Sequence, residues 1–234
     1  GLKILRKVAN GSYPAINPWD DDGKPLLASN ESLCDNLLAN FELTFPEGVD
    51  AEENNKKYLE NENREIVLTE EAEVSVCFVA ETADYQNAFG YYSYDKNNPP
   101  KKMKDIKDSM KVIFANASAN GSGGSLNEGD CVNIGSFPAG TVMGYFVIVN
   151  GWERNKKKVT EGLDTFFSNP KLNKGDKQQF ILMYNDDCTS LLTSFEEIQT
   201  KKGDRDFNDL VVKTNVTPLS AVNTTLLNKI PEAK

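Results

Sequence analysis

The sequence predicts an all-β protein, an antiparallel β-sandwich of the jelly-roll kind with little helix. Two observations lead to this prediction. Many short runs are rich in β-branched and aromatic residues, and Gly, Pro, Asn or Asp residues separate them. Several of the runs also alternate between apolar and polar residues, as a strand with one buried face does. Short strands with turn signals between them are typical of sandwiches and jelly rolls.

The N-terminal segment, residues 1–39, is expected to be mainly irregular. One short helix is predicted at 29–38, with Ser29 as its N-cap. Leu33 and Leu37 would lie on the same face of this helix because they are four positions apart.

The sandwich itself is expected over residues 40–216, followed by a tail or linker at 217–234. Its first strand is predicted at 41–45, where FELTF alternates apolar and polar residues. The strongest strand is predicted at 73–81, EVSVCFVAE, for the same reason. Further strands are predicted at 88–95, 111–118, 130–137, 141–149, 178–186, 190–195 and 206–216. The residues expected in the core are Val74, Val76, Phe78, Phe146, Ile148, Ile181 and Val211.

The composition limits the partners of the chain. The net charge at pH 7 is -9, so no basic surface is available for nucleic acid or anionic lipid, and a small cation is the more natural partner. Histidine is absent, which removes histidine-based catalytic triads and histidine-ligated zinc. No stretch approaches the ~20 apolar residues of a membrane helix, so membrane insertion is not expected.

The four cysteines form no CxxC pair, which argues against a zinc cluster or a thioredoxin-type motif. Cys77 and Cys131 lie inside predicted strands and are expected to be buried free thiols. Export from the cell would allow disulfides instead.

An acidic motif, GDRDFNDLVV at 203–212, comes directly before an apolar run. Its oxygen-bearing side chains are Asp204, Asp206, Asn208 and Asp209. Alternate residues of an extended segment project to one side, and Gly203 would allow a bend that brings Asp209 to the same place. Carboxylates this close repel one another unless water or a cation screens them. Hard oxygen ligands suit Ca²⁺, and the alternative is a solvated turn whose Asp residues cap backbone N–H groups.

Acids in two other segments support the metal hypothesis. Glu81 and Glu196 each follow a predicted strand, at the ends where the loops of a sandwich converge. They are therefore candidates to complete a metal shell. For the neighbouring Glu197, an ordinary surface position is the better expectation.

Four segments in this order, 79–95, 134–152, 166–173 and 194–212, resemble the bacterial domain of unknown function family 4114. The family occurs in LruC-type surface proteins and in large calcium-dependent adhesins, and the SFEEIQTKKGDRDFNDLVV block is the specific part of the match. The resemblance implies an extracellular, Ca²⁺-binding β-sandwich with carbohydrate or surface binding. The motif positions of the family fall on Glu81, Glu196, Asp204, Asp206, Asn208 and Asp209. Glu197 departs from the pattern, since the family often has Asp there.

Two residues beyond the acidic motif are candidates for ligand binding. Trp152 follows a loop-forming glycine, beside Asn150, after a strongly apolar strand. Its ring is expected either to stack on the face of a sugar or to pack at the rim of the sandwich.

Three functions fit these observations. The first is a non-catalytic, exported calcium-binding module for adhesion at a bacterial cell surface or for carbohydrate binding, with a glycan or a surface protein as partner. The second is a glycoside hydrolase that uses Glu81 and Glu196 as its two carboxylates. The third is a structural spacer that calcium stiffens. Clustered Asp and Asn residues fit a metal site better than an acid–base pair, which needs one raised pKa in an apolar pocket. We therefore expect a protein that is not an enzyme.

Overall fold

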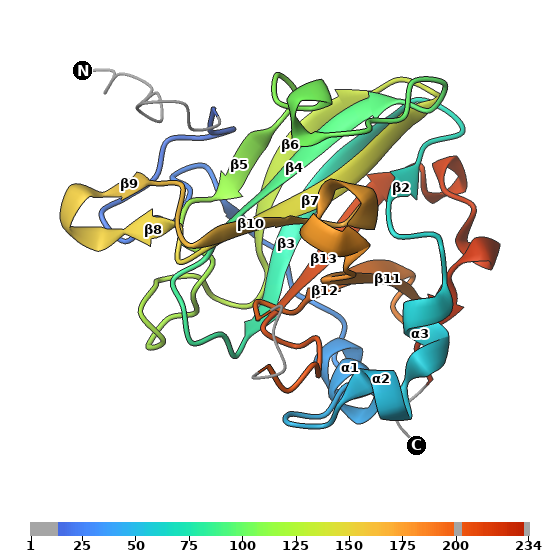
Figure 1. Ribbon diagram of the computed structural model, residues 1–234, viewed down its shortest axis with the longest axis horizontal. Coiled ribbons are helices and arrows are strands. Elements are labelled where there is room, and N and C mark those ends of the chain that lie inside the picture. Colours follow the sequence, from blue (N-terminus) through green and yellow to red (C-terminus); the bar gives the residue numbers. More distant parts are fainter. Residues whose placement is uncertain (1–13, 199–202, 232–234) are drawn as a thin grey trace.

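The computed structural model describes residues 14–198 and 203–231 and confirms the all-β prediction (Figure 1). The strands are β1 (Ser29–Asn30), β2 (Ile66–Val67), β3 (Ala72–Glu81), β4 (Ala88–Asp95), β5 (Lys111–Phe114), β6 (Asp130–Phe137), β7 (Thr141–Val149), β8 (Trp152–Glu153), β9 (Lys158–Val159), β10 (Asp164–Phe167), β11 (Phe180–Asn185), β12 (Ser190–Phe195), β13 (Leu210–Thr217) and β14 (Asn228–Lys229). The α-helices are α1 (Leu37–Thr44), α2 (Ala51–Asn54) and α3 (Lys56–Glu60). The 3-10 helices are η1 (Met103–Asp105), η2 (Arg154–Lys156), η3 (Pro170–Leu172), η4 (Lys174–Asp176), η5 (Leu219–Ala221) and η6 (Thr224–Leu226).

Two sheets form the sandwich. The larger has the strand order β1-β6-β3-β13-β12-β11-β14, and the smaller has the order β10-β7-β4-β5, with β2 beside β7. Neighbouring strands in the two sheets run antiparallel, apart from β14, which pairs with β11 in parallel. The hairpin β8–β9 stands apart from both sheets. No helix in the described ranges is long and apolar enough to cross a membrane.

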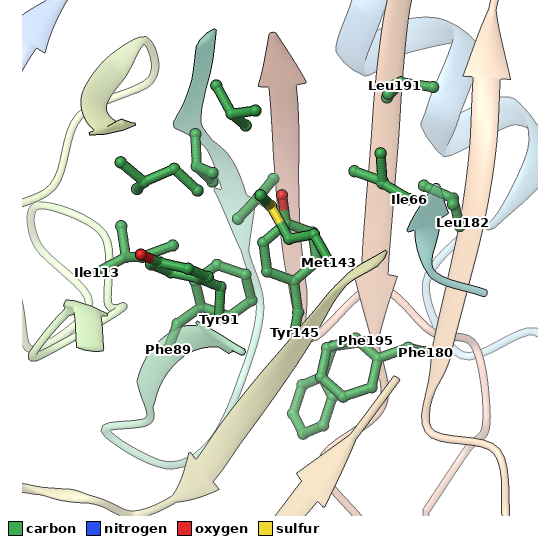
Figure 2. Packing of buried hydrophobic residues seen from close by; sticks show 14 of the residues in the cluster. Ile66, Phe89, Tyr91, Ile113, Met143, Tyr145, Phe180, Leu182, Leu191 and Phe195 are labelled. Atoms are coloured by element: carbon green, nitrogen blue, oxygen red, sulfur yellow. The ribbon is translucent and has the colours of Figure 1, made fainter. Parts of the chain in front are cut away.

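The main core lies between the two sheets (Figure 2). Aromatic side chains from both sheets fill it, and the rings of Phe89 and Tyr145 lie 5.1 Å apart. The buried hydroxyl of Tyr145 on β7 forms a 2.6 Å hydrogen bond with the hydroxyl of Thr214 on β13. This bond joins the sheets and satisfies two polar groups that would otherwise be costly to bury.

All seven residues predicted in the core are buried, but they belong to three clusters. Those on β3 lie between the sheets. Phe146 and Ile148 face outward from β7 and pack with Trp19 and Trp152. Ile181 and Val211 lie in a third cluster, together with apolar residues of α1 to α3. The outer faces of both sheets are therefore covered, which explains why β11 and β12 are buried at every position and β7 at every position after the first.

The predicted strand at 41–45 is wrong, because these residues belong to helix α1 and the residue after it. Leu37, Phe41 and Phe45 recur every four residues, and all three are buried. The Phe41 and Phe45 rings stack at 5.4 Å, while Leu43, which strand alternation would bury, is 65% exposed. A five-residue window cannot separate the two periodicities, and the helical one prevails here.

The chain also departs from the expectations for its two ends. Ser29 lies in strand β1, paired with Cys131, and does not cap a helix, which begins only at Leu37. At the other end, the described residues 217–231 do not behave as a tail or linker. Ala221 is buried in the core between the sheets, and Ile230 is buried in the third cluster, next to the strand pair β11–β14. The segment carries too few apolar residues in any regular period to reveal this packing in advance.

The expectation of free thiols is also wrong. Cys77 and Cys131 are bonded to each other across directly paired positions of β3 and β6, and Cys34 is bonded to Cys188. The second bond links the segment before α1 to the turn between β11 and β12. Pairings of this kind depend on strand register and three-dimensional proximity, which a single sequence does not reveal.

The core assignment predicts the effect of Phe78→Ala. Phe78 is 2% exposed, and its ring lies edge-on to Phe114. Because truncation removes buried contacts and leaves a cavity, we expect a loss of about 3–5 kcal/mol in the free energy of unfolding. Urea denaturation of both proteins measures it, and a loss well under ~1 kcal/mol would contradict the assignment of Phe78 to the core.

The disulfides predict the thiol content. With both bonds formed, a thiol-alkylating reagent should not modify the protein when it is unfolded without reduction. After reduction, the same reagent should modify all four cysteines. Mass spectrometry of the intact, alkylated protein makes the comparison. Label on Cys77 or Cys131 before reduction would contradict the structure.

Candidate metal centre

The acidic motif forms a loop between β12 and β13. The last strand was predicted to begin at Asp206, but β13 begins only at Leu210, so Asp204, Asp206 and Asn208 all lie in the loop. The backbone turns at Arg205 (φ 59°) and again at Phe207 (φ 61°). Residues other than glycine seldom adopt this left-handed conformation, and the surrounding contacts must hold them there.

Gly203 contributes in a different way from the one expected. Its φ is not positive, so the bend does not depend on it. A Cβ at this position would lie 2.8 Å from the Oε1 of Glu196 and 2.9 Å from the carbonyl oxygen of Ile198. Glycine is therefore needed because the loop passes directly over the Glu196 carboxylate.

The segment before α2 holds the loop in place. The N–H of Gly48 donates to the Oδ2 of Asp206 at 2.8 Å, and the N–H of Ala51 donates to the carbonyl oxygen of Arg205 at 2.9 Å. The Arg205 side chain forms an ion pair with Glu52 at 2.5 Å. These contacts connect the motif to residues 48–52, for which the sequence analysis predicted no element.

Carboxylates from both segments meet at this point. Oxygens of Glu47, Asp204 and Asp206 lie within 4.8 Å of one another. Sequence reasoning missed Glu47, because nothing in the surrounding residues indicates that its loop folds against the motif. Asp204 and Glu47 are exposed and Asp206 is buried, so the group reaches from solvent into the protein.

Glu196 lies beneath this group and is only 1% exposed. Its Oε1 accepts a hydrogen bond from the N–H of Ile198 at 3.2 Å, but its Oε2 is buried without a partner in the described part of the chain. The pKa of Glu196 is raised to about 7, mainly by burial and also by the negative charges of Asp204 and Asp206. An unpartnered buried carboxylate oxygen is costly and is normally satisfied by a donor or a cation.

Asp209 lies in the same electrostatic environment. Its Oδ2 accepts a 2.6 Å hydrogen bond from the N–H of Glu197. Burial raises its pKa to about 9, and the charges of Glu196, Glu197 and Asp206 act in the same direction. Asp209, a predicted ligand, therefore lies close enough to these three carboxylates to be affected by their charges.

Asn208 lies beside the carboxylates and is fixed by local bonds. Its N–H donates to the Oδ1 of Asp206 at 3.2 Å, and its side-chain oxygen accepts from the hydroxyl of Thr82 at 2.8 Å. The amide oxygen has a second lone pair, so this bond leaves it able to coordinate an ion.

The side chains of Glu81, a predicted ligand, and of Glu197, which was not expected to be one, are held by contacts outside the acidic loop. The half-buried Glu81 pairs with Leu210, directly after the acidic loop. Its carboxylate, however, accepts hydrogen bonds from the N–H of Ala119 at 3.1 Å and from the hydroxyl of Ser122 at 3.3 Å, and none of its described side-chain contacts reaches the loop. Glu197 is not an ordinary surface residue. It is 3% exposed, and its two carboxylate oxygens accept from the N–H of Asp84 and the side-chain amide of Asn87.

The two residues proposed for ligand binding lie elsewhere. Trp152 is 3% exposed, and its ring packs edge-on against Trp19 at 6.2 Å. Neither of its faces is open to a sugar in this structure, so the second expectation, packing, describes it. Asn150 is exposed in a left-handed turn, and its N–H donates to the side-chain oxygen of Asn87.

The donor set suits a hard divalent cation. It consists of carboxylate oxygens and one amide oxygen, and it carries an excess of negative charge. It also includes the buried Oε2 of Glu196, which has no hydrogen-bond partner in the part of the chain that the structure describes. Arg205 is the positive charge that acts on Glu196 from within the loop, and its guanidinium group is paired with Glu52. The residues that would hold the ion are Glu47, Glu196, Asp204, Asp206, Asn208 and Asp209.

The raised pKa values predict how metal-free stability depends on pH. In an unfolded chain these carboxyls titrate near pH 4, whereas in the folded protein Glu196 titrates at about 7 and Asp209 at about 9. Between these limits the folded state binds more protons, so the free energy of unfolding should fall as pH rises from about 5 to about 9.

Urea denaturation of the chelator-treated protein across this range tests the prediction. Asp209→Asn should flatten the curve, because the amide does not titrate, and the exposed-site control Asp164→Asn should not change it. Stability that is constant or increases over the range would contradict the assignment.

Comparison with known proteins gives one match. No curated protein and no solved structure is significantly similar to the chain. Residues 137–217, which include β7, β10 to β13, Glu196 and the acidic loop, match a family model. The model is described as a domain of unknown function (DUF4114), which confirms the resemblance that the acidic motif indicated.

Proposed function

We propose that this chain is a non-catalytic, calcium-binding β-sandwich module that acts outside the cell, in adhesion at a surface or in carbohydrate binding. The single observation that carries the calcium part is the Oε2 of Glu196, which is buried beneath a group of carboxylates and has no hydrogen-bond partner among residues 14–198 and 203–231. A bound cation would satisfy this oxygen and screen the repulsion among its neighbours.

Calcium is the cation that fits the donors best. It takes six to eight oxygen ligands in flexible geometry, whereas Mg²⁺ demands a near-ideal octahedron and keeps several waters. The donors come from two loops, one before α2 and one before β13, and they include exposed and buried carboxylates. Such a set can adapt to a large ion more readily than to a small one.

The two disulfides support a location outside the cell. Disulfides form and persist in oxidising compartments and are rare in the cytosol. Both bonds join segments that are distant in the sequence, with separations of 154 and 54 residues. Adhesion and carbohydrate binding rest on the resemblance to the surface-protein family.

The alternative, a glycoside hydrolase that uses Glu81 and Glu196, has one supporting observation, the pKa of Glu196 near 7. The contacts of Glu81 weaken it, because its carboxylate is engaged by the turn at residues 119–122. Release of reducing sugar from polysaccharides, lost in Glu196→Gln, would favour the hydrolase over the module.

Calcium should stabilise the protein. At a hundredfold excess over the dissociation constant, a ligand that binds only the folded state adds about 2.7 kcal/mol to the free energy of unfolding. For a chain of this size that corresponds to a rise of roughly 5–10 °C in the melting temperature. The measurement compares protein stripped of metal with the same protein in millimolar Ca²⁺.

Matched variants identify the site. Glu196→Gln keeps the shape of the side chain and removes its charge, so it should abolish the calcium-dependent shift and raise the melting temperature of the metal-free protein. Glu42→Gln, on the exposed face of α1, should keep the full shift. Identical melting of the wild-type protein in chelator and in Ca²⁺ would refute calcium binding.

A further inference from the structure

A second site lies outside the acidic loop and shares no residue with it. A cavity of about 710 Å³ opens among residues 62–65, the end of β4, the loop at 99–101 and the segment 169–176. Its volume is within the range of small-molecule sites. We propose that this cavity binds a neutral sugar residue, which would be held through its hydroxyl groups by Glu65 and Arg64.

The base of the cavity is a carboxylate held in a fixed orientation. The Oε1 of Glu65 accepts a 2.7 Å hydrogen bond from the hydroxyl of Tyr92, and its Oε2 accepts bonds from the hydroxyl of Tyr94 at 2.7 Å and from the side-chain amide of Asn169 at 3.2 Å. A carboxylate has about four acceptor positions. The three bonds leave one open, on Oε1.

The backbone is shaped to receive this carboxylate. A Cβ at Gly144 on β7 would lie 2.7 Å from the Oε1 of Glu65 and 2.3 Å from the Tyr92 hydroxyl oxygen. The Tyr92 and Tyr94 rings are almost parallel, at 10°, which places both hydroxyls beside the same carboxylate. Because Glu65 is largely withdrawn from water, burial raises its pKa, and the three donors oppose that rise. A carboxylate held in this way is preorganised to accept one more hydrogen bond.

Arg64 supplies donors beside this acceptor. One of its terminal nitrogens donates to the carbonyl oxygen of Leu59 at 3.0 Å, whereas its Nε is buried without a hydrogen-bond partner in the described ranges. A hydroxyl group donates and accepts at the same time. A sugar carries several hydroxyl groups, so it can donate to Glu65 and accept from the guanidinium group, which neither a purely anionic nor a purely cationic ligand can do.

The charges and the apolar lining both favour a neutral polyol. The charged side chains around the cavity are Glu62, Glu65, Asp176, Arg64, Lys101 and Lys171, three acidic and three basic. A net ionic ligand would thus meet a like charge on one side. Tyr94 and the prolines at 99, 100 and 170 provide apolar surface for the C–H face of a sugar ring. A fully apolar ligand would leave the open acceptor position of Glu65 and the Nε of Arg64 without a partner.

This inference rests on the carbohydrate branch of the proposed function, and its test is separate from the calcium test. An array of neutral glycans is probed with the full chain in saturating Ca²⁺, and the glycans that bind are titrated by calorimetry. Backbone amide shifts of the wild-type protein then map the site. We expect a neutral hexose-terminated glycan to bind and to move the amide signals of residues 62–65, 94, 169 and 171.

Variants connect binding to the named groups. Glu65→Gln and Tyr94→Ala should each raise the dissociation constant tenfold or more. Glu161→Gln, at the edge of a second cavity, should leave it unchanged. The shift map on the wild-type protein keeps the test decisive if a variant fails to fold. The inference would be overturned if no neutral glycan bound, or if the perturbed amides were confined to other residues. Binding of amino acids or other charged compounds alone would also overturn it. If calcium still raises the melting temperature in that case, only the sugar site fails.

Discussion

The acidic site depends on the burial of Phe207. This side chain is fully buried in the third cluster, among the residues of α1 to α3 and the outer face of the larger sheet. Its neighbour Arg205 packs over the ring and pairs with Glu52. Arg205 and Phe207 therefore anchor the loop to the helical layer, and the N–H of Gly48 holds Asp206 between them. The hydrophobic free energy of burying an aromatic ring, about 1.5–3 kcal/mol, opposes the strain of two left-handed residues and the repulsion among the acids.

The strands could be predicted because their signal is local. The run at 73–81 alternates cleanly, and the structure has a strand over almost the same residues. Strands β4, β6 and β7 likewise match the predicted bounds, since each ends where Gly, Pro, Asn or Asp interrupts an apolar run. The buried positions followed from the same patterns, but their division into three clusters did not, because it depends on which elements cover the outer faces.

The metal site could be predicted only in part. Asp204, Asp206 and Asn208 are close in the sequence, and their spacing indicated oxygen ligands directed to one place. Glu47 and Gly48 follow a stretch, 41–45, that was predicted as a strand and contains the end of helix α1, so the direction of the chain toward the motif was not visible. The packing of Trp152 was one of two expectations, but its partner Trp19 lies in a segment expected to be irregular, so this contact was not visible in the sequence.

The bond between Cys34 and Cys188 also gives the fold a mechanical property. Cys188 lies in the turn between β11 and β12, and β11 pairs in parallel with β14, close to the last described residues. A pulling force that enters at Cys34 and leaves beyond β14 would pass through the sulfur bridge directly to the β11–β12 turn. The 154 positions that separate the two cysteines would carry little of that load, and the strands that bear the acidic loop would resist it mainly through the parallel contact of β11 with β14. Under such a force, the Cys34–Cys188 bond would carry the tension, and the strands between the two cysteines in the sequence would not be stretched.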